Sequence, residues 1–138
     1  MDTREIFEFI KPQTHAVLAT VDEGNRPEAA LVEIAVSETL EILFDTISTT
    51  RKCENLRKNP NIALVIGHRG AQTLQYEGVA DEPKGSDLLM LKKCYFAACP
   101  AGESREGWPG LTYFRVKPRW IRLSNYYRPR SVREMTFS

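Results

Sequence analysis

The chain is a succession of short β-rich runs separated by turn signals, and this order constrains the fold more than any other feature. Residues 15–22 (HAVLATVD) and 27–36 (PEAALVEIAV) flank Glu23-Gly24-Asn25, so they predict a hairpin. Further runs of the same kind lie at residues 40–46, 61–68, 73–82, 111–117 and 119–126. Because they follow one another without regular strand–helix alternation, we expect a mainly β fold of about six strands, an antiparallel barrel rather than a doubly wound sheet.

Three segments interrupt this pattern with helical periodicity. Residues 2–11 predict a short leading helix, because Asp2 and Glu5 match a capping box and Pro12 ends the run. Residues 50–58 (TRKCENLRK) predict a second helix, which Asn59-Pro60 stops. A longer helix is expected over residues 86–98, with Ser86 as its N-cap and a wide apolar face.

The 138 residues match the size of one compact domain, and we expect a single domain over residues 1–138. The N-terminal helix is expected at about residues 3–11, and residues 127–138 are expected to form a flexible tail. No run of about 18 apolar residues occurs, which argues against a transmembrane helix. The charged N-terminal residues do not match a secretory signal, so a cytoplasmic location is expected.

Charge and cysteine usage exclude several classes of function. The 19 basic and 18 acidic residues nearly cancel, whereas a nucleic-acid binder of this size usually has a basic excess. Cys94, Cys99 and Cys53 lack the spacing of a zinc site and are interpreted as reduced thiols, with Cys53 packed beneath the second helix. His15 and His68 lie far apart, so no metal is expected, and each is interpreted as a structural residue.

The start of the second predicted helix is the best candidate for a binding site. Thr49 or Thr50 can cap it, and the first turn of a helix offers unpaired N–H groups and a partial positive charge. Arg51 and Lys52 lie in that turn, where cations are unfavourable unless an anion neutralises them. The pattern therefore favours a phosphate site, although both cations are also compatible with an ordinary solvated surface.

Residues 44–52 (FDTISTTRK) resemble the aromatic-x-Thr-x-x-x-Ser-Arg-Lys run of the pyridoxamine 5'-phosphate oxidase-like FMN-binding split-barrel family. The similarity continues through Asn55-Leu56, Asn59-Pro60 and the strand at residues 62–66. Glu77-Gly78-Val79-Ala80, residues 113–118 and Trp120-Ile121 follow in the family's order. Together these segments cover most of residues 14–126.

The resemblance implies a six-stranded antiparallel split barrel that forms a homodimer and binds FMN in a groove between the two subunits. Thr50, Arg51 and Lys52 match the phosphate-binding positions. The resemblance also implies that Thr46 and Asp45 lie along the flavin and that Gln72 lies near its ring. The residues implied beside the edge of the ring are Ala30, Leu31, Val32 and Glu33.

Two departures from the family pattern limit the function that the resemblance implies. The family's oxidases carry an Arg and a Lys around the second strand, where this chain has only Ala30-Leu31-Val32-Glu33-Ile34-Ala35. They also end in a Trp-Gln-Gly and Arg-Leu-His-Asp-Arg clamp, where residues 123–130 read LSNYYRPR. Oxidation of pyridoxamine phosphate is therefore not expected here.

Two classes of function remain open from the sequence. The first is an FMN-dependent oxidoreductase with an unknown small-molecule substrate and no catalytic residue that stands out. The second is a non-catalytic dimer that binds or senses flavin, or a barrel without a cofactor that serves as an interaction module. A deazaflavin or haem in the same groove is a further alternative to FMN.

Overall fold

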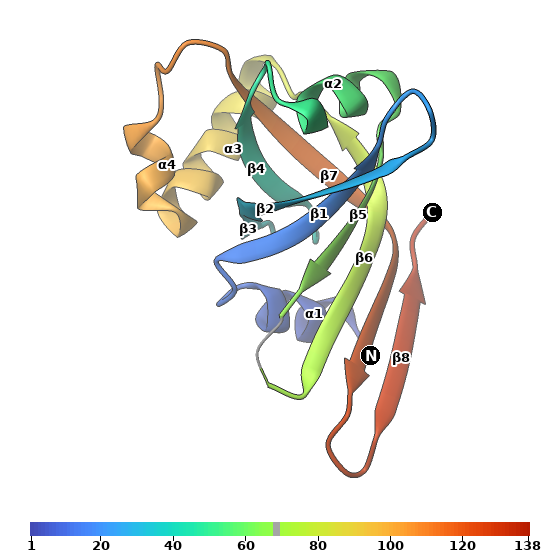
Figure 1. The fold of residues 1–138 in the computed structure, drawn as a ribbon. Helices are drawn as coiled ribbons and strands as arrows, with labels where there is room; N and C mark the ends of the chain where they lie inside the picture. The colour runs from blue at the N-terminus through green and yellow to red at the C-terminus, as the bar shows by residue number, and fades with distance from the viewer. Residues whose placement is uncertain (68–69) are drawn as a thin grey trace.

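A computed structural model describes residues 1–67 and 70–138 and shows a curled antiparallel sheet with helices at its ends (Figure 1). The strand order is β2-β1-β5-β6-β7-β4-β3, and β8 pairs with β7. The strands are β1 (His15–Val21), β2 (Pro27–Glu33), β3 (Ala35–Val36), β4 (Ile42–Ile47), β5 (Asn61–Ile66), β6 (Gln72–Asp81), β7 (Leu111–Asn125) and β8 (Ser131–Thr136). The helices are α1 (Thr3–Ile10), α2 (Arg51–Lys58), α3 (Gly85–Ala98) and α4 (Pro100–Ser104). The expected mainly β barrel is confirmed, with eight strands rather than six.

The concave side of the sheet encloses the main core. Apolar side chains from every second strand position pack there with the buried face of α1. Phe44 and Phe114 stack at its centre with ring centroids 5.4 Å apart. A second, smaller core lies between β3, β4, β7 and α3 and includes Leu43, Leu91 and Tyr95. This packing fixes α3 on the outside of the sheet.

The run expected as one strand over residues 27–36 divides at Ile34 into β2 and β3. The backbone N–H of Ile34 donates to the Thr14 carbonyl at 3.0 Å, and then Ala35 and Val36 pair with β4 instead of β1. The chain thus passes from one side of the barrel to the other, while Val32, Ile34 and Val36 remain buried on the way. β2 is consequently an edge strand with β1 on one side.

The two strands expected at residues 111–117 and 119–126 form a single long strand, β7. Pro118, which lies between the two expected runs, has no N–H group to donate to a neighbouring strand. The strand continues because a bulge shifts the register between Glu77 and Gly78, so that Pro118 faces Gly78 and Arg119 is the extra residue. Gly78 is required there, since a Cβ atom on it would lie 2.3 Å from the Lys117 carbonyl oxygen.

The helix starts differ in detail from the sequence expectations. Asp2 caps α1 as expected, accepting from the Glu5 N–H at 2.9 Å. α3 begins at Gly85 with Lys84 at the N-cap, so the cap lies two residues before the predicted Ser86. α4 and β8 were not expected, and β8 lies within the tail that was expected to be flexible, paired with β7 along residues 120–125. His68, predicted near the end of β5, lies outside the described residues.

The helices lie at separate places around the sheet. α1 lies below the curled sheet in Figure 1, α2 lies above it beside the β1–β2 hairpin, and α3 and α4 flank β3 and β4. None of the helices that the structure describes is long and apolar enough to cross a membrane. The start of α2 is therefore free to form a site with β1 and β2.

Candidate functional site

A cavity of about 330 Å³ lies between the start of α2 and the strands β1 and β2. Its volume falls in the lower part of the range for small-molecule sites, about 300–1,000 Å³. It is lined by Leu18, Thr20, Glu28, Ala29, Ala30, Thr49, Thr50, Arg51 and Lys52. Four predicted cofactor contacts, Ala30, Thr50, Arg51 and Lys52, thus lie around one space although 20 sequence positions separate the first two.

Thr50 occupies the N-cap position of α2, but its hydroxyl does not cap the helix. It donates to the Ile47 carbonyl at 2.8 Å and lies 2.8 Å from the hydroxyl of Thr46. The predicted side-chain cap is therefore wrong, because the preceding turn provides a nearer acceptor. Glu54 makes the first backbone bond of the helix, to the Thr50 carbonyl. The N–H groups of Arg51, Lys52 and Cys53 precede that bond, so they lie outside the helical ladder.

A carboxylate lies in the cavity beside these donors. Glu28 Oε2 is 3.1 Å from Nη1 of Arg51, and Glu28 Oε1 accepts from Asn55 Nδ2 at 2.8 Å. The same Asn55 amide donates to the Thr20 hydroxyl at 3.0 Å. The Glu28 side chain is 17% exposed, whereas the Arg51 side chain is 77% exposed. Glu28 is therefore held in place, and Arg51 reaches it from the solvent side.

Cys53 lies on the buried side of α2. Its side chain is fully buried, and burial raises the pKa of its thiol. The interpretation of Cys53 as a packed thiol is confirmed, because the effect of burial exceeds that of the nearby Arg57 charge.

A second polar cluster lies between the end of β2, β4 and α4. Arg105 Nε donates to Asp45 Oδ2 at 3.0 Å, and Arg105 Nη1 donates to Glu33 Oε1 at 3.1 Å. The Tyr95 hydroxyl accepts from Arg105 Nη2 at 3.2 Å and lies 3.2 Å from Asp45 Oδ1. The hydrogen bond to Asp45 raises the pKa of Arg105, so this cation is fixed. We refer to Glu33, Asp45, Tyr95 and Arg105 as the Arg105 cluster.

The other predicted contacts are distributed over five places. Thr46 contacts Thr50 at the cavity, while Asp45 and Glu33 belong to the Arg105 cluster. Val32 points into the main core, and Leu31 points outward with 64% of its surface exposed. Gln72 begins β6 at the end of the sheet opposite α2 (Figure 1). Within one subunit, Gln72 does not reach the cavity.

Sequence reasoning missed Glu28, Thr20, Asn55 and Arg105. A signal for Glu28 was present, because strand alternation places it on the same face of β2 as Ala30 and Val32. Its register partner Thr20 follows from the hairpin pairing. Arg105 gave no such signal, since it follows α4 in a polar connection without periodicity. Its partners Asp45 and Glu33 lie 60 and 72 positions away.

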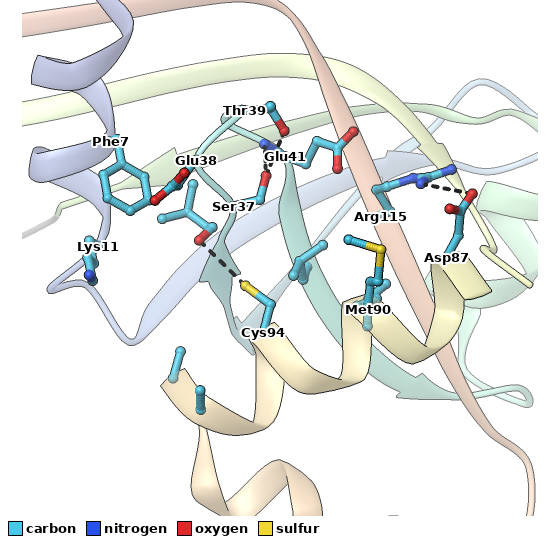
Figure 2. A pocket seen from close by; sticks show the side chains of 15 residues that line it. Phe7, Lys11, Ser37, Glu38, Thr39, Glu41, Asp87, Met90, Cys94 and Arg115 are labelled. Atoms are coloured by element: carbon cyan, nitrogen blue, oxygen red, sulfur yellow. Dashed lines mark hydrogen bonds and ion pairs between the residues drawn. The ribbon is translucent and has the colours of Figure 1, made fainter. Parts of the chain in front are cut away.

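A larger cavity of about 600 Å³ lies elsewhere, between α1, the β3–β4 turn and α3 (Figure 2). Its charged lining residues are the carboxylates Glu38, Glu41 and Asp87 and the cations Lys11 and Arg115. Arg115 is already paired with Asp87 at 3.6 Å and with Asp81 at 2.7 Å. Because carboxylates dominate its rim, this cavity suits a phosphate less well than the smaller one, and no predicted contact lines it.

The smaller cavity fits a phosphate ester on the chemistry of its donors. Two cations and the N–H groups at the start of α2 lie beside it, and Ala29 and Ala30 leave space on the strand side. Among the residues that the structure describes, no three His, Cys, Asp or Glu side chains are grouped as a metal site requires. The two cations and the N–H donors beside the cavity suit an anion.

Comparisons with known proteins identify the family and the fold. Residues 2–125 match the family described as pyridoxamine 5'-phosphate oxidase. A pyridoxine/pyridoxamine 5'-phosphate oxidase from Bordetella avium is 30% identical over 99 residues, which cover 70% of this chain and 45% of that protein. The chain thus matches less than half the length of this curated relative.

Solved structures share the fold at low sequence identity. A haem-binding protein from Mycobacterium smegmatis superposes with a TM-score of 0.86 at 17% identity, over 99% of this chain and 58% of that chain. A putative pyridoxamine 5'-phosphate oxidase from Listeria innocua gives 0.71 at 19% identity, over 88% and 96% of the two chains. The haem storage protein HutZ from Vibrio cholerae gives 0.73 at 17% identity, over 84% and 89%.

Proposed function

The chain belongs to the pyridoxamine 5'-phosphate oxidase family, and from this premise we propose that it is an FMN-binding flavoprotein. The observation that carries the proposal is the arrangement of Ala30, Thr50, Arg51 and Lys52 around one cavity beside the start of α2. The family motif singled out these positions from the sequence, and the cavity has the donors that a phosphate ester requires.

In this proposal, the start of α2 holds the phosphate of FMN. Arg51 supplies a planar pair of donors, Lys52 supplies a mobile ammonium, and the exposed N–H groups of the first turn supply the remaining bonds. Bound FMN would supply hydride or electron transfer, and the protein would orient the cofactor and limit access of water. No residue around the cavity is proposed as a catalytic acid or base, so the chemistry would be that of the cofactor. The proposed substrate is a small molecule.

The outer face of the sheet supports the proposed homodimer. Leu31, Val17 and Val65 face each other in register across β2, β1 and β5, and they are 64%, 42% and 44% exposed. Such a row of exposed apolar residues on neighbouring strands is typical of an interaction face. Because the cavity residue Ala29 lies on the same face of β2 as Leu31, a second copy on this face would extend the cavity into a groove shared by two subunits.

Oxidation of pyridoxamine phosphate is not part of this proposal. Residues 123–130 lack the substrate clamp of the family's oxidases. In the structure, residues 123–125 end β7 and are paired with β8. The proposed activity is therefore that of an FMN-dependent oxidoreductase acting on another small molecule, with a non-catalytic flavin-binding dimer as the alternative.

Haem is the second cofactor to consider, because two of the similar structures are named as haem proteins. A haem iron requires an axial ligand such as His, Cys, Met or Tyr. None of these residue types occurs among the described residues that line the cavity. This lining favours FMN over haem at that position.

The visible spectrum of the purified protein distinguishes these cofactors. We expect flavin absorption bands and release of FMN on denaturation. A Soret band would identify haem instead, a deazaflavin would be recognised by chromatography of the released cofactor, and a colourless protein that does not quench the fluorescence of added FMN would contradict flavin binding altogether.

The double substitution Arg51→Ala/Lys52→Ala tests the position of the phosphate. Each charge-assisted hydrogen bond contributes about 1.5–3 kcal/mol, so FMN affinity should fall by several kcal/mol at most. The matched control is Arg57→Ala/Lys58→Ala, which removes the same charge from the other end of α2, where both cations form exposed ion pairs. Equal loss of affinity in the two variants would show that the phosphate does not bind at the start of α2.

The proposed dimer is tested by Leu31→Glu, which places a charge at the most exposed residue of the apolar row. We expect sedimentation to show a monomer that has also lost FMN affinity. Leu89→Glu is the control, because Leu89 is 69% exposed on α3, away from this row. A Leu31→Glu variant that remains dimeric would exclude this face as the interface.

A further inference from the structure

The Glu28 carboxylate occupies the place beside Arg51 that an anionic ligand would take. We propose that Glu28 is an internal anion that competes with the phosphate of FMN for Arg51 and so sets how strongly the site binds phosphorylated ligands. This inference rests on the proposed function, and it assigns a role in ligand selection to a residue that the family motif does not include.

The geometry shows that Glu28 is fixed in the cavity. Its two carboxylate oxygens have separate partners, with Oε1 accepting from Asn55 at 2.8 Å and Oε2 lying 3.1 Å from Arg51. Asn55 is buried and also donates to Thr20, the residue opposite Glu28 in the β1–β2 register. Asn55 and Thr20 therefore hold the carboxylate in place independently of Arg51.

The two partners of the ion pair differ in mobility. Arg51 is 77% exposed and contacts Glu28 through one guanidinium nitrogen, so it is able to turn toward a ligand at little cost. Glu28 is 17% exposed and remains beneath it. A bound phosphate, which carries close to two negative charges at neutral pH, would then lie near this carboxylate. Arg51 gives up its bond to Glu28 when it binds the phosphate, so part of the attraction from Arg51 is offset.

The expected consequence is selectivity that depends on ligand charge. Glu28 weakens the binding of FMN, whose phosphate meets the carboxylate, and has little effect on riboflavin, which lacks the phosphate. The β2 cations of the family's oxidases are absent from this chain, and Glu28 adds a negative charge to the same strand. The site therefore binds phosphate less strongly than its Arg51-Lys52 pair alone indicates.

The test compares FMN and riboflavin binding to the apoprotein by flavin fluorescence quenching, in the wild type and in Glu28→Gln. The glutamine amide oxygen preserves the acceptor for Asn55 while removing the charge. We expect FMN affinity to rise by about fivefold, because Arg51 no longer has a carboxylate partner to leave when it binds the phosphate, and riboflavin affinity to remain unchanged. Glu23→Gln is the matched control, because it removes the same charge from the β1–β2 turn, where Glu23 pairs with Lys58.

Adding Arg51→Gln separates competition from general repulsion. If Glu28 competes for Arg51, most of the gain from Glu28→Gln should disappear in the Arg51→Gln background. A full gain in that background, an equal gain for riboflavin, or no gain at all would each overturn the inference while leaving FMN binding intact. Failure of both the wild type and Glu28→Gln to bind FMN would instead overturn the proposed function, and this inference with it. Thermal unfolding of each variant confirms that the fold is retained.

Discussion

Two arginines, Arg51 beside the start of β2 and Arg105 beside its end, differ in exposure and in the number of their partners. Arg51 is 77% exposed and has a single carboxylate partner, Glu28. Arg105 is 18% exposed and donates to Asp45, Glu33 and Tyr95. Both lie beside segments that the family resemblance assigned to the cofactor, yet only Arg51 lines the cavity.

The difference shows how the chain separates binding from structural support. A guanidinium has five N–H donors, and a ligand requires some of them to be unused. Arg105 makes four hydrogen bonds to the three partners of its cluster, so few donors remain. Arg51 keeps most of its donors and its freedom to move. We infer that Arg105 fixes α4 against the barrel and that Arg51 is available to a ligand.

Replacing Arg105 with alanine should have the largest effect on stability. The substitution leaves Asp45 and Glu33 partly buried without their cation, and breaking a buried pair in this way costs about 3–5 kcal/mol. Because the Glu33 side chain is 31% exposed, we expect a loss at the lower end of this range, about 3 kcal/mol in the free energy of unfolding. Urea denaturation measures this loss. A loss below about 1 kcal/mol would show that the cluster is not a structural clamp.

Replacing Arg51 with alanine should produce the opposite pattern. FMN affinity should fall by about 1.5–3 kcal/mol, the contribution of one charge-assisted hydrogen bond. The free energy of unfolding should change by less than about 1 kcal/mol, because the ion pair with Glu28 is largely exposed on the Arg51 side. Titration with FMN and urea denaturation of the same preparation measure both quantities. If the loss appeared in stability and not in affinity, the assignment of binding to Arg51 would be wrong.

The sequence was sufficient to predict the barrel and the position of α2. Strand alternation, turn residues and the ordered family motif are local signals, and they placed Thr50, Arg51 and Lys52 at the start of a helix that the structure contains. The expected strand break at Pro118 was wrong because the compensating bulge depends on Gly78 of a neighbouring strand. β8 was missed because residues 131–136 have weak apolar alternation and form a strand only by pairing with β7.

The Arg105 cluster illustrates what sequence reasoning lacked. Asp45 and Glu33 were assigned to the cofactor because they lie in the matching segments, and that role is still a prediction. Their partner Arg105 is distant in sequence, and only the packing of α3 and α4 against β4 brings it near. Contacts of this kind follow from tertiary structure and leave no periodic trace.

The pH dependence of the free energy of unfolding tests whether water reaches the thiol of Cys99, close to the Arg105 cluster. Cys99 is buried, its Sγ donates to the Ile34 carbonyl at 3.2 Å, and burial raises its pKa from 9.0 to about 11. In the unfolded chain the thiol ionises at the lower pH, so this contribution to stability is complete below pH 9 and is lost as the pH rises through about 11.

Replacing Cys99 with alanine should therefore reduce the fall in stability between pH 9 and pH 11. The free energy of unfolding, measured at several pH values under reducing conditions, shows the difference in slope between variant and wild type. Cys94→Ala provides the comparison of slopes, because burial raises the pKa of the Cys94 thiol in the same direction although this thiol is only half-buried. An unchanged slope in Cys99→Ala would mean that water reaches this thiol.

The smallest effect is expected from two tyrosines that flank Asp45, and it separates the polar contacts of the cluster from its packing. The Tyr95 hydroxyl bonds with Asp45 and Arg105, whereas the buried Tyr113 hydroxyl has no hydrogen-bond partner in the described part of the chain. Tyr95→Phe should lower the free energy of unfolding by about 1 kcal/mol, since it removes bonds to two charged groups that keep their own pairing. Tyr113→Phe should leave it unchanged or raise it, because it removes a buried polar atom without a partner. Urea denaturation of both variants measures the contrast, and no loss in Tyr95→Phe would show that ring packing, rather than the hydrogen bonds of Tyr95, holds α3 against the Arg105 cluster.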